Sequence, residues 1–144
     1  IDSINSSPCE INDIFRFVIV LKTEEELIKK VITQIEKQIE VIAAFYHTDE
    51  ETVFQESALY KLNSKSLLEE KNIQNIIKNA HANIVTVSKD FFVIEKTGYR
   101  EETEKLYKDL SKYGLLQFVR SGRISVTKEP MRITEILAQN QNHE

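Results

Sequence analysis

The histidines and the cysteine are the side chains best suited to hold a metal ion, and their spacing argues against that role. His47, His81 and His143 lie far apart along the chain, and Cys9 is its single cysteine. Neither a His-x-x-x-His nor a Cys-x-x-Cys spacing occurs, so a zinc site would need ligands gathered from distant segments. We expect no metal site, with His47 in a linker, His81 near a helix end and His143 in a frayed tail.

Paired glutamates occur at several places, and paired carboxylates can serve as general acid and base. The pairs fall within 24–26, 69–70 and 101–102. Each set lies near the start of an expected helix, where negative charge offsets the exposed amide dipoles. No nucleophile with a matching base accompanies them, and 3 glycines in 144 residues cannot form a Gly-x-Gly-x-x-Gly or Walker loop. We therefore expect no catalytic residue and no cofactor on this chain.

Two arginines near the carboxy-terminal end are candidates for a functional contact. Arg120 and Arg123 flank Gly122 in the otherwise apolar run LQFVRSGR. A contact with an anion or a partner protein would suit this pair, and a solvated strand edge explains it equally well. We retain Arg120 and Arg123 as candidate partner contacts.

Composition and charge exclude several classes of protein. The chain carries 19 Lys and Arg against 23 Asp and Glu, a net charge of −4, and the two signs are interleaved. A nucleic-acid module needs clustered basic residues, so this class is not expected. There is no apolar run of roughly 20 residues to span a bilayer, and residues 1–13 lack the pattern of a signal peptide. The expected location is the cytoplasm.

The first half of the chain has the expected order β-β-α-β. Segment 14–21 is rich in β-branched and aromatic residues and predicts a buried strand, paired with an edge strand over 1–9. Thr23 and Glu26 have capping-box spacing, and the apolar stripe that follows predicts a helix extending toward Ile39. Segment 41–46 is expected to be the closing strand, before a polar connector at 47–52.

The second half predicts the order β-α-β-β-α-β, which is the ferredoxin-like arrangement. Strands are expected over 53–62, 84–87, 91–95 and 115–126, the last with a bulge or bend at Gly122. Helices are expected after the Ser66–Glu69 capping pair, with a break near residue 71, and over 100–113. Pro130 is expected to start one more helical turn. The fold class is therefore α+β, with two ferredoxin-like βαββαβ domains in tandem, the first lacking its leading strand and helix. The domains are 1–49 and 50–128, followed by a helical turn and tail at 129–144.

Several strings resemble the regulatory (small) subunit of acetolactate synthase, also called acetohydroxyacid synthase, over nearly the whole chain. They are QIEKQIEVIAAFYHTDE, ESALYKL, IVTVSKDFFVIEKTG and LLQFVRSGRISVTKE. The charged insertion at 47–52 resembles members of the Bacteroidetes group. The resemblance implies an ACT domain followed by a second ferredoxin-like domain, with the first strand and helix of the ACT domain expected upstream of Ile1.

The resemblance also implies a function in the biosynthesis of branched-chain amino acids. The family's large subunit holds thiamin diphosphate, magnesium and FAD, and condenses pyruvate with pyruvate or 2-oxobutyrate. The small subunit raises that activity and confers feedback inhibition by valine, which binds where two ACT domains meet in a homodimer. Of the effector site, the resemblance implies that Ile1, Asp2 and Ser3 are present here. Two other functions remain open at this point, an ACT-type amino-acid sensor that regulates transcription and a ferredoxin-like metalloenzyme or metal sensor.

Overall fold

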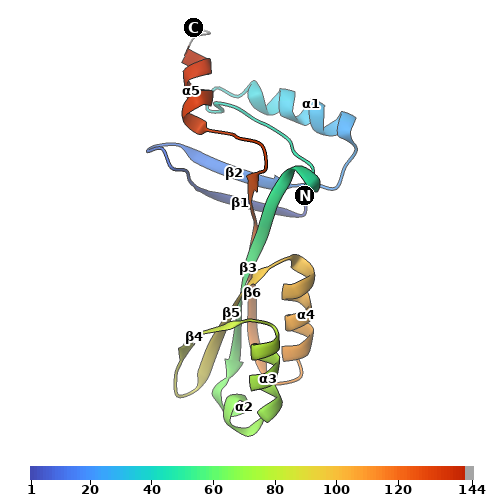
Figure 1. Cartoon of the computed structure of the whole chain (residues 1–144), viewed down its shortest axis with the longest axis vertical. Coiled ribbons are helices and arrows are strands. Elements are labelled where there is room, and N and C mark those ends of the chain that lie inside the picture. The colour runs from blue at the N-terminus through green and yellow to red at the C-terminus, as the bar shows by residue number, and fades with distance from the viewer. Residues whose placement is uncertain (142–144) are drawn as a thin grey trace. The chain divides into compact units, whose positions relative to one another are not determined.

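The computed structural model describes residues 1–141, which form two compact units. The first unit comprises residues 1–54 together with the described residues from 125 on, and the second comprises Gln55–Ile124. Helices and antiparallel sheets occur together, which confirms the expected α+β class (Figure 1). None of the helices within residues 1–141 has the length and apolar character that a membrane span requires.

The second unit is built on a four-stranded antiparallel sheet in the order β4-β5-β3-β6. Helices α2, α3 and α4 all lie on one face of this sheet (Figure 1). The elements in chain order are β3 (Thr52–Asn63), α2 (Ser64–Glu69), α3 (Lys71–Asn79), β4 (Asn83–Val87), β5 (Phe91–Gly98), α4 (Arg100–Leu110) and β6 (Leu115–Thr127). The order βαββαβ expected for this half is confirmed, with its first helix broken at Glu70, one residue before the expected break.

The core of the second unit lies between the sheet and the helices. Alternate residues of a strand point to one face, so every second residue of the central strands β3 and β5 packs against the helices. The buried apolar residues are Ala58, Tyr60, Leu62, Ile73, Ile77, Phe92, Ile94, Leu106 and Leu110. All of them belong to β3, β5, α3 and α4, which are the elements that the two-residue and 3.6-residue periods predicted.

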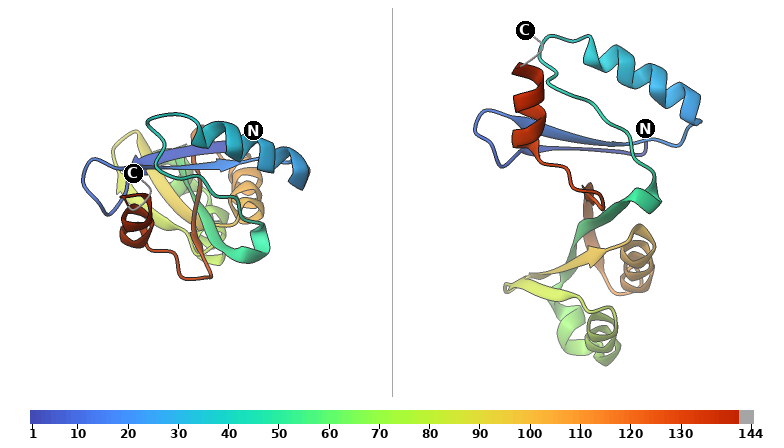
Figure 2. Two further views of the ribbon diagram at one scale, coloured as in Figure 1. Left: turned by 90° about the horizontal axis from the view of Figure 1, so that it is seen from above. Right: turned by 45° about the horizontal axis from the view of Figure 1, so that its top comes forward.

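The first unit is more open than the second. It contains a two-stranded antiparallel sheet of β1 (Ser3–Pro8) and β2 (Phe15–Val20), with helices α1 (Glu25–Glu36) and α5 (Ile133–Gln141). Helix α1 runs along the hairpin in Figures 1 and 2. None of the described residues of this unit is buried, and its apolar side chains are at best half-buried. The described part of this unit therefore has no closed hydrophobic core.

The strand expected over 41–46 does not form, which corrects the β-β-α-β order of the first half. A strand needs a neighbour for its main-chain hydrogen bonds, and the sheet of this unit consists of β1 and β2. The segment is tied to α1 instead, because the Tyr46 hydroxyl donates a 3.0 Å hydrogen bond to Oε1 of Glu25. Lys29 lies 2.7 Å from the same carboxylate oxygen, and this hydrogen-bonded ion pair lowers the pKa of Glu25.

Several helix boundaries also differ from the sequence prediction, and α4 ends at Leu110 rather than at residue 113. Helix α1 begins at Glu25 with no side-chain cap, and it ends at Glu36, so the stripe toward Ile39 continues beyond the helix. Helix α2 begins earlier than expected, because the side chain of Asn63 accepts a hydrogen bond from the main-chain N–H of Lys65. Helix α5 begins at Ile133 rather than at Pro130, and residues 142–144 of the expected tail lie outside the described residues.

Candidate functional site

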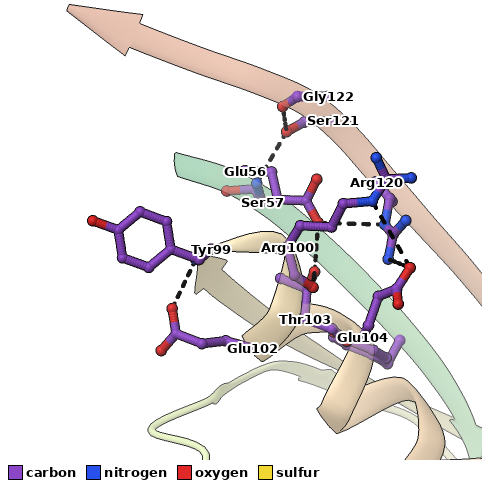
Figure 3. A network of polar contacts seen from close by, with 11 residues as sticks. Glu56, Ser57, Tyr99, Arg100, Glu102, Thr103, Glu104, Arg120, Ser121 and Gly122 are labelled. Carbon is purple, nitrogen blue, oxygen red and sulfur yellow. Dashed lines mark hydrogen bonds and ion pairs between the residues drawn. The ribbon is translucent and has the colours of Figure 1, made fainter. Parts of the chain in front are cut away.

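The second unit places a set of charged and polar side chains at the edge of its core, at the end where β5 stops and α4 starts. We call Glu56 of β3, Thr103 and Glu104 of α4, and Arg120 of β6 the polar cluster (Figure 3). Glu56 is only 8% exposed and Thr103 is fully buried. An isolated charge in such a place is strongly unfavourable, so the contacts of these residues decide whether the unit is stable.

The carboxylate of Glu56 has both a neutral donor and a cation beside it. The Thr103 hydroxyl donates a hydrogen bond to Oε1 of Glu56 and also lies 3.0 Å from the carbonyl oxygen of Arg100. The Nε atom of Arg120 is 3.3 Å from the same Oε1, an ion pair that falls short of hydrogen-bond geometry. The carboxylate of Glu56 is therefore joined to both α4 and β6.

Arg120 connects the two carboxylates of the polar cluster. Its Nη2 atom donates to Oε1 of Glu104 at 3.2 Å, so one guanidinium bridges β3 and α4 from its position on β6. The same guanidinium lies 5.1 Å from the centre of the Phe118 ring, a cation–π distance. The arginine therefore contributes both charge and packing at this end of the core.

Tyr60 extends the polar cluster into the apolar core. Its hydroxyl donates a 2.6 Å hydrogen bond to the carbonyl oxygen of Thr103, and its ring stacks on Phe118 at 5.0 Å. Burial raises the pKa of Tyr60 well above its usual value, against the smaller opposing effect of Arg120. The phenol therefore keeps its proton and donates this hydrogen bond across the whole physiological pH range.

A second buried charge lies nearby on the same face of the sheet. Lys96 of β5 is only 8% exposed, and its Nζ atom is 3.7 Å from Oε1 of Glu102. The other carboxylate oxygen of Glu102 accepts a 2.7 Å hydrogen bond from the main-chain N–H of Tyr99, which caps the first turn of α4 (Figure 3). This pair fixes the start of α4 to β5.

The arrangement holds elements together and offers no reacting group. Every member of the polar cluster is engaged with another part of the same unit, and no nucleophile faces a free base within it. Within residues 1–141, no group of three or more histidine, cysteine or acidic side chains is placed to hold a metal ion. Chemically, the site can fix the geometry of β3, β6 and α4.

The sequence-predicted partner contacts Arg120 and Arg123 lie on the same strand and have different surroundings. Arg120 points toward α4 with its side chain only 23% exposed, because it takes part in the polar cluster. Arg123 follows Gly122, which has a φ of 76°, and is half-buried. Glu56, Lys96 and Thr103 were not predicted to be functional from the sequence.

The sequence-predicted effector residues lie together at the open end of the β1–β2 hairpin. Ile1 precedes β1 and is 82% exposed. The main-chain N–H of Asp2 donates a 2.7 Å hydrogen bond to the carbonyl oxygen of Val20, and Ser3 is the cross-strand partner of Val20. Asp2 and Ser3 are therefore positioned by the last residue of β2.

An open groove of about 270 Å³ is a separate feature of the first unit. It lies between the segment that contains Phe45 and His47 and the start of α5, and Arg132 and Glu135 also line it. The lining does not include Ile1, Asp2 or Ser3. The groove and the sequence-predicted effector residues are thus two different places on this unit.

Comparisons with known proteins assign this combination of units to a family. Residues 55–129 match the family described as "Small subunit of acetolactate synthase". The acetolactate synthase small subunit of Bacillus subtilis is 31% identical over 123 residues, which cover 85% of this chain and 71% of that protein. The corresponding protein of Mycobacterium bovis is 29% identical over 133 residues, which cover 92% of this chain and 79% of the relative.

A solved structure gives the same result for the fold. The crystal structure of an acetolactate synthase small subunit from Thermotoga maritima superposes with a TM-score of 0.78, covering 90% of this chain and 80% of that one. Its sequence identity is 24%, so this likeness concerns the fold alone. The family match covers the whole second unit, and the matches with relatives extend into the first. The chain belongs to the family of acetolactate synthase small subunits.

Proposed function

We propose that this chain is the non-catalytic regulatory subunit of a cytoplasmic acetolactate synthase. It raises the activity of the large subunit and confers feedback inhibition by valine in the biosynthesis of branched-chain amino acids. The observation that carries this proposal is the alignment with named small subunits, which spans 92% of the chain and therefore both of its units. An alignment limited to one unit would have supported only a shared domain.

Catalysis and cofactors belong to the large subunit in this proposal. Thiamin diphosphate, magnesium and FAD are expected there, and no cofactor is assigned to this chain. The polar cluster supports this division, because the charges of Glu56, Glu104 and Arg120 are taken up by contacts with one another. These side chains serve the stability of the regulatory subunit rather than a reaction.

The first unit is assigned to an ACT domain that forms a homodimer. The proposed domains are the ACT domain at 1–49 and the second ferredoxin-like domain at 50–128, followed by the helical turn and tail at 129–144. Its hairpin has an apolar face on which Phe15, Phe17 and Ile19 alternate along β2, with Ile4 paired to Ile19. Phe17 is 64% exposed in the single chain. A second copy of this unit would cover such a face, because burying apolar surface is the main driving force for association.

Valine is assigned to the hairpin end of this unit, at the surface where two copies meet. Ile1, Asp2 and Ser3 remain the proposed contacts, and the hydrogen bond from Asp2 to Val20 fixes the main chain there. A ligand shifts an equilibrium only by its differential affinity for two states. Valine must therefore bind one arrangement of the paired ACT domains more tightly than another.

The proposal is tested by reconstitution with the purified large subunit of the same organism. Acetolactate formation is followed with and without the full-length small subunit while valine is titrated. We expect the small subunit to raise the rate, valine to lower it only when the small subunit is present, and the small subunit alone to form no acetolactate. An unchanged rate at saturating small subunit would contradict the proposal, and an unrelated small protein at equal concentration is the control.

A further inference from the structure

The two units are connected by a pair of hydrogen-bonded strands. Both β3 and β6 cross the boundary between the units, which falls at Phe54 on the way out and at Ser125 on the way back. Strand β5 pairs with β3 only from Glu56 onward. Beyond that point β3 and β6 continue as a two-stranded ribbon, and its end is marked by a 2.9 Å hydrogen bond from Lys128 N–H to the carbonyl oxygen of Glu51. We call residues 52–55 and 123–127 the connecting ribbon.

The regular ladder of β3 and β6 is interrupted where the connecting ribbon leaves the four-stranded sheet. The main-chain N–H of Ser57 donates a 3.0 Å hydrogen bond to the side-chain oxygen of Ser121, so a side chain replaces the usual carbonyl partner (Figure 3). The Ser121 hydroxyl in turn donates to the carbonyl oxygen of Gly122 at 2.7 Å. Gly122 has a φ of 76°, a left-handed conformation that favours glycine. These features define a bulge, which bends a strand and increases its local twist.

The sheet side of this bulge is held in place by the polar cluster. Arg120 precedes the bulge directly and is bound to Glu56 and Glu104, so β3, β6 and α4 are fixed to one another one residue before the bend. On the ribbon side, β5 no longer pairs with β3, and β6 is the neighbouring strand of β3. A sheet end fixed by ion pairs and followed directly by a glycine bulge is the arrangement expected of a hinge.

We propose that the Ser121–Gly122 bulge is a hinge that sets the direction in which the connecting ribbon leaves the sheet, and that effector binding on the first unit reaches the second unit through it. The hinge itself follows from the geometry alone. Its regulatory role rests on the proposed function, because it needs valine to bind on the first unit. The hinge and its regulatory role are therefore tested by two separate measurements.

The hinge is tested by the distance between spin labels on the two units of the full-length chain. Labels are attached at Lys30→Cys on α1 and Lys108→Cys on α4, two exposed positions, in a Cys9→Ser background. The five ribbon residues of β6 span about 16 Å at roughly 3.3 Å each. A change of about 20° at the bulge, the size of an ordinary strand twist, therefore moves the far end by about 5 Å.

Gly122→Ala makes the left-handed conformation of the bulge unfavourable, so we expect the label distance distribution to change its maximum or width. Gly114→Ala is the matched control, because Gly114 has an almost equal φ of 75° and lies before the opposite end of β6. It should leave the distribution unchanged. Superimposable distributions for wild type and Gly122→Ala, or equal changes in both variants, overturn the hinge.

The regulatory role is tested with the reconstituted enzyme and valine. We expect Gly122→Ala to change the half-inhibiting valine concentration by at least about fivefold, the lower end of typical allosteric coupling, and Gly114→Ala to leave it within about twofold. A wild-type value with Gly122→Ala overturns the regulatory role. If valine does not inhibit even with the wild-type chain, the proposed function and the regulatory role both fail, while the label distances still decide the hinge.

Discussion

The hydroxyl of Tyr60 donates a 2.6 Å hydrogen bond to the main-chain carbonyl oxygen of Thr103, deep between β3 and α4. This bond joins the central strand to the helix at the residue whose own side chain binds Glu56. The phenol is fully buried and must keep its proton to donate. Ionisation of Tyr60 is therefore incompatible with this packing.

The first prediction concerns stability at alkaline pH. Burial raises the pKa of Tyr60 in the folded chain, whereas in the unfolded chain a tyrosine ionises near pH 10. Above about pH 10 the unfolded state therefore binds fewer protons, and the free energy of unfolding falls by up to about 1.4 kcal/mol per pH unit from this group. Urea unfolding at several pH values should show this slope.

The variant Tyr60→Phe should remove the pH dependence of stability, and it should cost about 1 kcal/mol of stability at neutral pH. The control Tyr107→Phe, at an exposed position, should retain the pH dependence. An unchanged slope in Tyr60→Phe would refute the assignment.

The second prediction concerns the ion pair between Arg120 and Glu56. Arg120→Leu leaves the Glu56 carboxylate buried without its cation, and we expect the free energy of unfolding to fall by about 2 kcal/mol, less than for a fully buried pair because the arginine is partly exposed. The double variant Glu56→Gln with Arg120→Leu should recover part of this loss, because no unpaired charge remains. Denaturant titration measures both. Lys112→Ala, at an exposed position of the same unit, should change stability by less than about 0.5 kcal/mol. Strictly additive losses would argue against coupling.

The third prediction concerns the relative stability of the two units. The buried residues of the described chain all lie in the second unit, and the first contains none. Elements with little buried apolar surface open at low free-energy cost. Hydrogen exchange followed by mass spectrometry should therefore show β1, β2 and α1 exchanging well before β3 and β5. Equal protection of the two units in the chain alone would contradict this order.

The fourth prediction concerns self-association through the hairpin. Phe17→Ser removes the most exposed apolar side chain from the face formed by β2, so we expect it to weaken the proposed dimer without altering the second unit. Leu68→Ser is the control, because Leu68 is 86% exposed on α2. Light scattering over micromolar concentrations should show a dimer for wild type and Leu68→Ser, and a shift toward monomer for Phe17→Ser. A monomeric wild-type chain would count against the dimer itself.

The second unit was predictable from the sequence because local periods and tertiary packing agree there. The alternation in β3 places Ala58, Tyr60 and Leu62 on one face, and all three are buried against the helices. The first unit was less predictable. Segment 41–46 has the residue types of a strand, but strand formation depends on a neighbour that a local pattern cannot supply.

The polar cluster was missed although a pattern in the sequence marks it. Glu56 lies two residues before Ala58 on the core face of β3, and Lys96 continues the buried alternation of Phe92 and Ile94 on β5. Each is a charged residue at a position where the two-residue alternation of the strand predicts an apolar one. That two neighbouring strands break their pattern at the same end of the sheet is the signal that would have found the site. Sequence spacing alone did not show that Arg120 contacts Glu56 and Glu104.

The course of the chain, which leaves the first unit at Phe54 and returns to it at Ser125, has a consequence for synthesis on the ribosome. Translation proceeds at about 5–20 residues per second, so the intervening Gln55–Ile124 occupies roughly 4–14 s. During this interval the β1–β2 hairpin has emerged without the closing segment of its own unit. The second unit, whose residues are contiguous, can complete its core first. In nascent chains, the second unit should therefore become resistant to protease before the first unit does. Until the first unit is complete, the exposed phenylalanines of the β1–β2 hairpin are available for chaperones to bind.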